Sequence, residues 1–217
     1  MIANMSFMSK LRRRNEDATQ PERSGQREWY EYFRDILYIF VIFLVVYTLL
    51  FRIVQVDGPS MNDTLYDGDR LLLVSNLIYK NPQQGDIIVA SKDSFRNGEC
   101  IIKRVIATEG QWVDIDFVAG IVYVGDSKDA MQPLQEDYIL NATHMKEGVN
   151  FPLQVDSGCV FVMGDNRMNS KDSRSPEIGL IDCREILGKA LLLLIPSDPD
   201  GVNGPQKADW SRIGWLG

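Results

Sequence analysis

The apolar and polar positions change pattern once, early in the chain. Residues Ile36 to Phe51 read ILYIFVIFLVVYTLLF, sixteen positions without a charge, bounded by Asp35 and Arg52. A helix that crosses a bilayer needs about 20 apolar residues, and an arginine at its end can extend its charged group to the interface. The run therefore predicts a transmembrane helix over 36–52, with the core helix of a soluble protein as the alternative.

The segment before this run has the composition of a basic tail, residues 1–35. Lys10 and Arg12 to Arg14 lie in it, and aromatic residues typical of a membrane interface follow at Trp29, Tyr30, Tyr32 and Phe33. Thirty-five residues precede the run and no A-x-A pattern follows it, so we expect an anchor that is retained and not a cleaved signal peptide.

Charge divides the chain in the same place. Residues 1–52 carry eight Lys and Arg against six Asp and Glu, whereas residues 53–217 carry fifteen against twenty-four. The positive-inside rule places the N-terminus in the cytoplasm and the rest outside, and makes the lipid bilayer a partner. The net charge of −7 argues against nucleic acid as a partner.

After the anchor the apolar positions come in short runs rich in β-branched residues and separated by Gly, Pro, Asn and Asp. We expect strands at Ile53–Val56, Arg70–Ser75, Asp86–Ala90, Cys100–Ala107, Trp112–Phe117, Ile121–Val124, Cys159–Met163 and Lys189–Ile195. No long segment here has a helical period. The pattern predicts a mostly β domain of bent antiparallel sheets over 53–195, with a polar insert at about 126–150 and a C-terminal tail at 196–217.

One serine has the setting of a nucleophile. Ser60 lies in GPSMNDTL, a turn-forming stretch directly after the anchor. A nucleophilic serine needs a base, and the single histidine, His144, lies in the polar insert, where an exposed loop position is expected. No G-x-S-x-G or S-x-x-K motif is present.

A lysine is the remaining candidate base, provided that burial lowers its pKa from about 10.4. Lys103 fits best, because it lies in the apolar run CIIKRVIA. A pKa shift of about 3 units would cost about 4 kcal/mol of stability. A second interpretation is a strand lysine that faces solvent. Side chains alternate along a strand, so Lys103 shares a face with Ile101 and Val105, while Arg104 lies on the other face, and either face could meet solvent.

A third stretch, GDNRMNSKDSR at residues 164–174, follows the apolar run CVFVM. Its alternating carboxylates and guanidinium groups can pair with one another and build a rigid turn-rich loop. Such a loop could orient a neighbouring group, although a solvated charged loop has the same composition.

Together these stretches resemble the bacterial type I signal peptidases, the Ser-Lys endopeptidases that remove signal peptides from exported proteins. The resemblance runs from the anchor to about Ile195 and includes DGPSMNDTL, GDRLLLVSN, IKRVIATEG and GDNRMNSKDSR. It implies that Ser60 is the nucleophile and Lys103 the base, and that Ser170 hydrogen-bonds the lysine. The same resemblance gives supporting roles to Asp165, Arg167, Asp172 and Arg174.

The resemblance also carries expectations about the substrate. Some members have a serine two residues before the nucleophile that helps to bind the oxyanion; here that residue is Gly58, so the Ser60 amide and the backbone near Gly58 are the expected donors. Met61, Leu65 and Ile102 would line shallow pockets for small side chains. The implied partners are preproteins that carry signal peptides.

No metal or organic cofactor is expected. Cys100, Cys159 and Cys183 have no metal-type spacing, and their disulfide state stays open. Two other functions fit parts of the pattern: a membrane-anchored β binding module without catalysis, and a Ser-Lys autoprotease of the repressor-cleaving kind.

Overall fold

A computed structural model describes residues 21–92, 95, 98–198 and 209–216. Its N-terminal unit is helix α2 (Pro21–Leu50), which is longer at its start and shorter at its end than predicted. Residues 21–35, expected in the tail, are helical because proline is favoured in the first turn and Glu, Arg and Gln are good helix formers. Phe51 and Arg52, expected in the helix, begin strand β1 (Phe51–Gln55), where they pair with β2.

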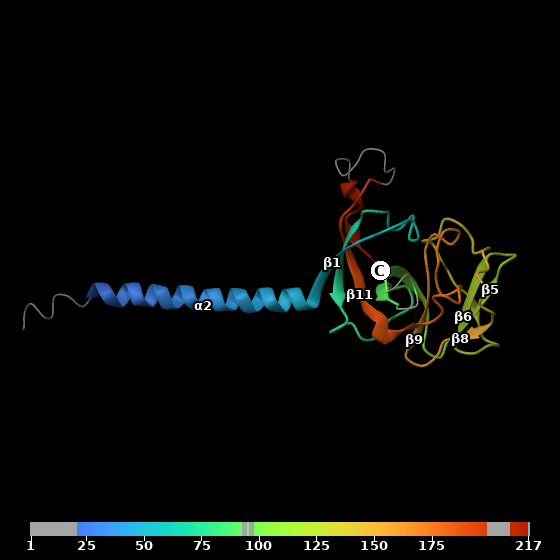
Figure 1. Cartoon of the computed structure of the whole chain (residues 1–217), viewed down its shortest axis with the longest axis horizontal. Coiled ribbons are helices and arrows are strands. Elements are labelled where there is room, and N and C mark those ends of the chain that lie inside the picture. The colour runs from blue at the N-terminus through green and yellow to red at the C-terminus, as the bar shows by residue number, and fades with distance from the viewer. Residues whose placement is uncertain (1–20, 93–94, 96–97, 199–208, 217) are drawn as a thin grey trace, which may run out of the picture. The chain divides into compact units, whose positions relative to one another are not determined.

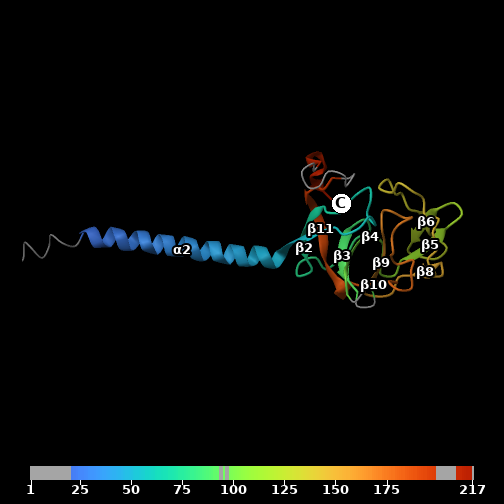
Figure 2. The ribbon, with the colours of Figure 1, turned by 45° about the horizontal axis from the view of Figure 1, so that its top comes forward.

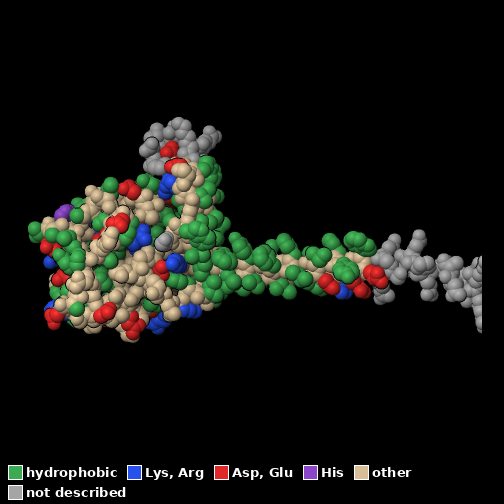
Figure 3. Space-filling view, turned by 180° about the vertical axis from the view of Figure 1, so that it is seen from behind, with side chains coloured by type: hydrophobic (Ala, Val, Ile, Leu, Met, Phe, Trp, Pro, Cys, Tyr) green, Lys and Arg blue, Asp and Glu red, His purple; other side chains and the backbone are tan. Residues whose placement is uncertain are grey.

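Helix α2 has the length and composition of a membrane span. Its segment Glu28–Leu50 spans 23 residues and contains an 18-residue window with a mean hydropathy of 2.1, none of which is buried. Figure 3 shows apolar side chains exposed along the helix. A helix that is apolar all round belongs in a membrane or in a large core.

The β unit contains a large antiparallel sheet (Figure 1). Its strand order is β1-β2-β11-β3-β4-β9-β10, and β12 pairs with β11. The bounds not yet given are β2 Arg70–Ser75, β3 Ile87–Ser91, β4 Cys100–Thr108, β9 Cys159–Met163, β10 Ile181–Asp182, β11 Ile186–Ile195 and β12 Gly214–Trp215. Short 3₁₀ helices lie at Cys183–Glu185 and Trp210–Arg212.

A smaller antiparallel sheet has the order β7-β6-β5-β8 (Figure 2). Its bounds are β5 Trp112–Asp116, β6 Ile121–Gly125, β7 Gln132–Pro133 and β8 Leu153–Gln154. Every run predicted as a strand is one, within one or two residues at its ends except at the start of β11, which begins three residues earlier than predicted. The strands that were not predicted, β7, β8, β10 and β12, are two residues long. Such strands are too short for alternation to be visible.

Register shifts bend the large sheet. They interrupt the pairing of β4 with β9 between Val105 and Ala107, and the pairing of β11 with β2 at two places. Irregularities of this kind increase the local twist of a strand, as the prediction of bent sheets requires. The bends allow three separate apolar cores to form in one unit, one of which packs Met61 and Leu65 against the large sheet.

Strand β4 is covered on both of its faces. Every residue from Ile101 to Ala107 is buried, so neither Lys103 nor Arg104 meets solvent, and the interpretation with one exposed face is wrong. Residues Cys100 to Lys103 pair with β3 on one side, while β9 begins to pair only at Arg104. Among the described residues, the other edge of β4 from Cys100 to Lys103 is therefore open.

The described part of the C-terminal segment belongs to the β unit. Strand β12 pairs with β11 at Leu192 and Leu193. The buried Asp69 accepts hydrogen bonds from the Ser197 amide at 2.6 Å and from Arg212 Nη2 at 2.6 Å. These contacts hold residues beyond the boundary predicted at residue 195, on both sides of the undescribed 199–208, to the sheet.

Candidate active site

Ser60 lies in a compact turn between β1 and β2. The Asn62 amide donates to the Pro59 carbonyl at 3.2 Å, and the Leu65 amide donates to the Met61 carbonyl at 2.9 Å. Met61 and Leu65 are fully buried in the core, and their packing holds the turn that carries Ser60 in place. Gly58 has a φ of +85°, a conformation that other residues adopt only with strain, and it allows the chain to turn sharply into Pro59.

Lys103 extends from β4 to this turn. Its Nζ lies 2.7 Å from Ser60 Oγ and donates to the Ile102 carbonyl at 3.0 Å. The residue is 4% exposed. Burial lowers the pKa of Lys103 to about 8, although Asp172 and Asp165 oppose the shift. At pH 7 roughly one amine in ten is then neutral, which is far more than for an exposed lysine and enough for a base.

The loop at 164–174 packs beside the amine and is internally paired. Asp172 forms a two-point ion pair with Arg174, with Nε to Oδ1 and Nη2 to Oδ2 both at 2.8 Å. The Gly164 amide donates to the same carboxylate at 3.0 Å. Both charged side chains are fully buried, and paired charges are the kind that a protein interior accepts. The charged groups of the loop are therefore paired and buried, while Met168, Asn169 and Lys171 are exposed.

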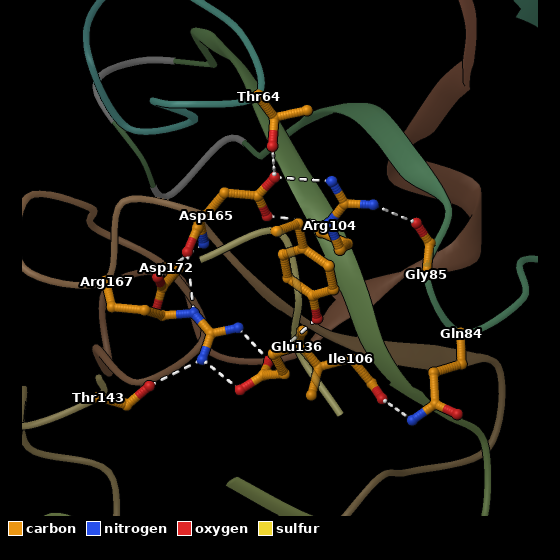
Figure 4. Close-up of polar contacts among 12 residues, drawn as sticks. Thr64, Gln84, Gly85, Arg104, Ile106, Glu136, Thr143, Asp165, Arg167 and Asp172 are labelled. Carbon is orange, nitrogen blue, oxygen red and sulfur yellow. Dashed lines mark hydrogen bonds and ion pairs between the residues drawn. The ribbon is translucent and has the colours of Figure 1, made fainter. Parts of the chain in front are cut away.

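Asp165 joins three segments that lie far apart in the sequence (Figure 4). It accepts two hydrogen bonds from Arg104, at 2.9 and 2.7 Å, and one from the Thr64 hydroxyl at 2.6 Å. Arg104 also donates to the Gly85 carbonyl at 2.9 Å and stacks on the Tyr138 ring at 4.0 Å. The carboxylate thus connects the strand of Lys103 with the turn of Ser60.

Arg167 connects the same loop to the polar insert. Its guanidinium group forms a two-point ion pair with Glu136 and donates to the Thr143 hydroxyl at 2.7 Å. Its Nε donates to the Gly164 carbonyl at 3.1 Å. The insert therefore contributes a buried carboxylate to the support of the site, a role that its polar composition did not reveal.

Two expected contacts are not made. Ser170 Oγ is buried, but it has no hydrogen-bond partner among the described residues, so the predicted bond to Lys103 is absent from this structure. The Gly58 amide donates to Asp67 at 2.8 Å, which occupies a donor expected in the oxyanion hole. The Ser60 amide has no such competitor among the described residues. The Gly58 amide therefore helps to form the turn, and a second hydrogen-bond donor for the oxyanion is not assigned.

A cleft of about 520 Å³ opens over the pair. Ser60, Lys103 and Ser170 line it, together with Val54 to Gly58 and Cys100 to Ile102. Two of the side chains expected to contact substrate, Met61 and Ile102, also line the cleft. The third, Leu65, does not; it lies fully buried in the core beneath the turn.

The remaining candidate groups are the histidine and the three cysteines, of which Cys100 lines the cleft. His144 is exposed as predicted, and its Nδ1 lies 3.0 Å from the Phe117 carbonyl. Cys100, Cys159 and Cys183 are free thiols. Within the described ranges, no group of three or more His, Cys, Asp and Glu side chains could hold a metal ion.

The residues not predicted from the sequence are those that pair with the predicted ones. Arg104, Thr64 and Glu136 bind Asp165 or Arg167, and Asn166 donates its amide to the Ser60 carbonyl at 3.1 Å. The sequence did contain a signal for Arg104, because an arginine in an apolar strand needs a carboxylate partner if it is buried. Thr64 and Glu136 carried no comparable signal.

Comparisons with known proteins show the family to which the chain belongs. Residues 29–195 match the family described as signal peptidase, peptidase S26. A probable signal peptidase I-1 of Synechocystis sp. is 40% identical over 69% of this chain and 74% of its own length. Signal peptidase I of Bacillus amyloliquefaciens is 32% identical over 81% of this chain and 91% of its own. A solved signal peptidase I from Enterococcus faecalis V583 is 28% identical, with a TM-score of 0.33, over 51% of this chain and 97% of that one.

The protein is thus a serine endopeptidase with a mostly antiparallel β fold that follows one apolar helix. It belongs to the signal peptidase family, peptidase S26. The resemblance stated from the sequence motifs is confirmed, and a β binding module without catalysis is excluded.

Proposed function

We propose that this protein is a membrane-anchored endopeptidase that cleaves signal peptides from exported preproteins, with Ser60 as nucleophile and Lys103 as base. The observation that carries the proposal is the 2.7 Å separation of Ser60 Oγ and a buried lysine amine in a member of the signal peptidase family. The amine has a lowered pKa, so it can accept a proton near neutral pH.

The chemistry proceeds through an acyl-enzyme. Neutral Lys103 takes the proton from Ser60 as the hydroxyl oxygen attacks the scissile carbonyl carbon. The carbon–nitrogen bond then breaks, and the Lys103 ammonium returns its proton to the leaving amine. In the second half, Lys103 deprotonates a water molecule that attacks the ester, and the proton returns to Ser60.

Ser170 has a part in this scheme that fits its unpartnered hydroxyl. Once Ser60 is acylated, the Lys103 amine loses the hydroxyl group that it hydrogen-bonds in the resting site. Ser170 lies in the lining of the same cleft, and its buried Oγ has unused hydrogen-bonding capacity. A change of rotamer would let it orient the ammonium, and bonds to charged groups are the stronger ones. For the oxyanion, the Ser60 amide is the donor that we assign.

A peptide substrate fits the edges that line the cleft. The edge of β4 at Cys100–Lys103 is not paired with a further strand among the described residues, and the segment Val54–Gly58 borders the same space. An extended peptide can add to such an edge as a further strand. Met61 and Ile102 line the cleft and would restrict the side chains next to the cut to small ones.

The anchor and its orientation complete the proposal. The segment Glu28–Leu50 is long and apolar enough to span a bilayer, and the basic residues before it favour a cytoplasmic N-terminus. Ser60 follows Leu50 by ten residues, so extended chain keeps it within about 35 Å of the end of the helix. We expect carbonate extraction to leave the protein in the membrane fraction. Protease added outside the cell should cleave the β unit and not the tail.

The catalytic assignment is tested with the full chain in detergent micelles and a preprotein substrate. Ser60→Ala and Lys103→Ala should each lower kcat/KM by about 10³-fold or more, with cleavage by the wild type at the signal-peptide junction. Full activity in either variant would refute this pair. Self-cleavage, with the preprotein left intact, would favour the autoprotease instead.

A further inference from the structure

Ser60 and Lys103 are brought together from two segments, and their own hydrogen bond is too weak to hold those segments in register. The turn of Ser60 is a connection between strands, whereas Lys103 lies on a strand with neighbours on both faces. Something must therefore fix the turn relative to β4 with an accuracy of a few tenths of an ångström, because reaction rates depend steeply on such distances.

The loop at 164–166 makes three contacts with the Ser60 turn. The Asn166 amide donates to the Ser60 carbonyl at 3.1 Å, and Asn166 Nδ2 donates to the Pro59 carbonyl at 3.1 Å. The third contact is the bond from the Thr64 hydroxyl to Asp165 Oδ2 at 2.6 Å. A Cβ atom at Gly164 would overlap the Ser60 carbonyl, so the loop and the turn approach as closely as the backbone allows.

Of these three contacts, the one from Thr64 shares its acceptor with β4. The Asp165 oxygen that accepts from Thr64 also accepts from Arg104 Nη2 at 2.7 Å, and the second oxygen accepts from Arg104 Nε at 2.9 Å. Arg104 follows Lys103 in the chain, and Thr64 lies one turn beyond Ser60. Asp165 is fully buried, so water does not compete for these bonds.

We propose that Thr64 is a positioning residue, whose hydroxyl holds Ser60 at hydrogen-bond distance from Lys103 through the carboxylate that Asp165 shares with Arg104. The inference rests on the proposed function, since it assumes that Ser60 and Lys103 react. Thr64 itself does not line the cleft and does not touch the reacting atoms.

The test compares two substitutions at one position. Thr64→Val has nearly the same shape but no hydroxyl, and Thr64→Ser keeps the hydroxyl. With the full chain in micelles, we expect Thr64→Val to lower kcat about 10-fold with KM within about 2-fold. Thr64→Ser should restore kcat to within about 2-fold of the wild type. The pH at which activity rises should stay the same in both, because the charges around Lys103 do not change.

The matched control is Thr108→Val, which removes a threonine hydroxyl from the far end of β4. That hydroxyl donates to Gln111 Oε1 at 3.2 Å and is not part of the cleft. The kcat of this variant should equal that of the wild type. Thermal unfolding of each sample gives the folded fraction, by which kcat is normalised, so loss of folded protein cannot imitate loss of positioning.

Two results would overturn the inference: normalised kcat of Thr64→Val within 2-fold of the wild type, or equal loss in Thr64→Ser and Thr64→Val. Either result would leave the proposed function intact as long as Ser60→Ala and Lys103→Ala are inactive. If those two variants remain active, the proposed function fails first, whatever the Thr64 variants do.

Discussion

The two faces of strand β4 bury adjacent cations in opposite ways. On one face the amine of Lys103 has a serine hydroxyl and a carbonyl as its nearest partners. On the other face the guanidinium group of Arg104 is bound at two points by the fully buried Asp165. Both residues are nearly inaccessible, yet burial without a directly bonded carboxylate lowers the pKa of Lys103 to about 8.

The difference shows that the chemical type of a buried cation and its partners, and not burial alone, decide what it does. A buried amine without a bonded carboxylate loses its proton more readily and can act as a base, whereas a guanidinium group stays charged in proteins and here becomes part of the scaffold by pairing with Asp165. The nearby carboxylates Asp172 and Asp165 raise the pKa of Lys103 without bonding to it, which offsets part of the effect of burial.

The largest effect should follow from replacing each of the two cations, in separate variants, with the other residue type. Lys103→Arg keeps a positive charge that cannot be removed, so we expect kcat/KM for preprotein cleavage to fall by about 10³-fold or more. Arg104→Lys keeps the charge but loses the second bond to Asp165 and the stacking on Tyr138, so stability should suffer more than activity. If Lys103→Arg stays active, proton transfer to residue 103 is not part of the mechanism.

Removal of the partner on the Arg104 face should mainly affect folding. Asp165→Asn leaves a buried guanidinium group without its counter-charge, so the free energy of unfolding should fall by about 3 kcal/mol or more. Denaturant unfolding of the full chain in micelles measures this. Asp114→Asn is the control, because Asp114 on β5 accepts only from the Ile115 amide, and its change should stay below about 0.5 kcal/mol. Equal changes in the two variants would contradict the role given to Asp165.

The burial of the Lys103 amine without a bonded carboxylate should make the free energy of unfolding depend on pH. The folded pKa of Lys103 lies below its unfolded value, so the penalty is complete below pH 8, fades as pH rises from about 8 to 10.5, and is absent above. Lys103→Met removes it and should therefore stabilise the chain more at pH 7 than at pH 10, by about 3 kcal/mol. A gain that does not vary with pH would mean that the amine is not destabilised in the folded state.

The smallest expected effect is that of Ser170→Ala. Because Ser170 Oγ has no partner in the resting site, its removal should leave the free energy of unfolding unchanged or slightly raised. The kcat should fall about 10-fold if the hydroxyl binds the ammonium during the reaction. Ser173→Ala provides the contrast, because Ser173 Oγ accepts from the buried Val162 amide at 2.9 Å and its loss should lower stability. Unchanged kcat in Ser170→Ala would remove Ser170 from the mechanism.

Much of the site could be predicted from local sequence. Strands β4 and β9 were predicted from their β-branched runs. Ser60, Lys103 and the loop at 164–174 were predicted from their motifs. The start of α2 and the strand at Phe51 were not, because the apolar pattern does not distinguish a helix end from a strand that continues it. The two-residue strands have no periodicity to detect.

By itself, the sequence determined the apolar anchor, the β class of the following unit and the residue types that can carry out serine chemistry with a lysine base. These are properties of neighbouring residues, which act over short distances along the chain. Only the tertiary structure decided that both faces of β4 are buried and that Asp165 selects Arg104 as its partner. Burial and pairing depend on segments distant in sequence, so only the folded chain lowers the pKa of Lys103 and pairs Arg104 with Asp165.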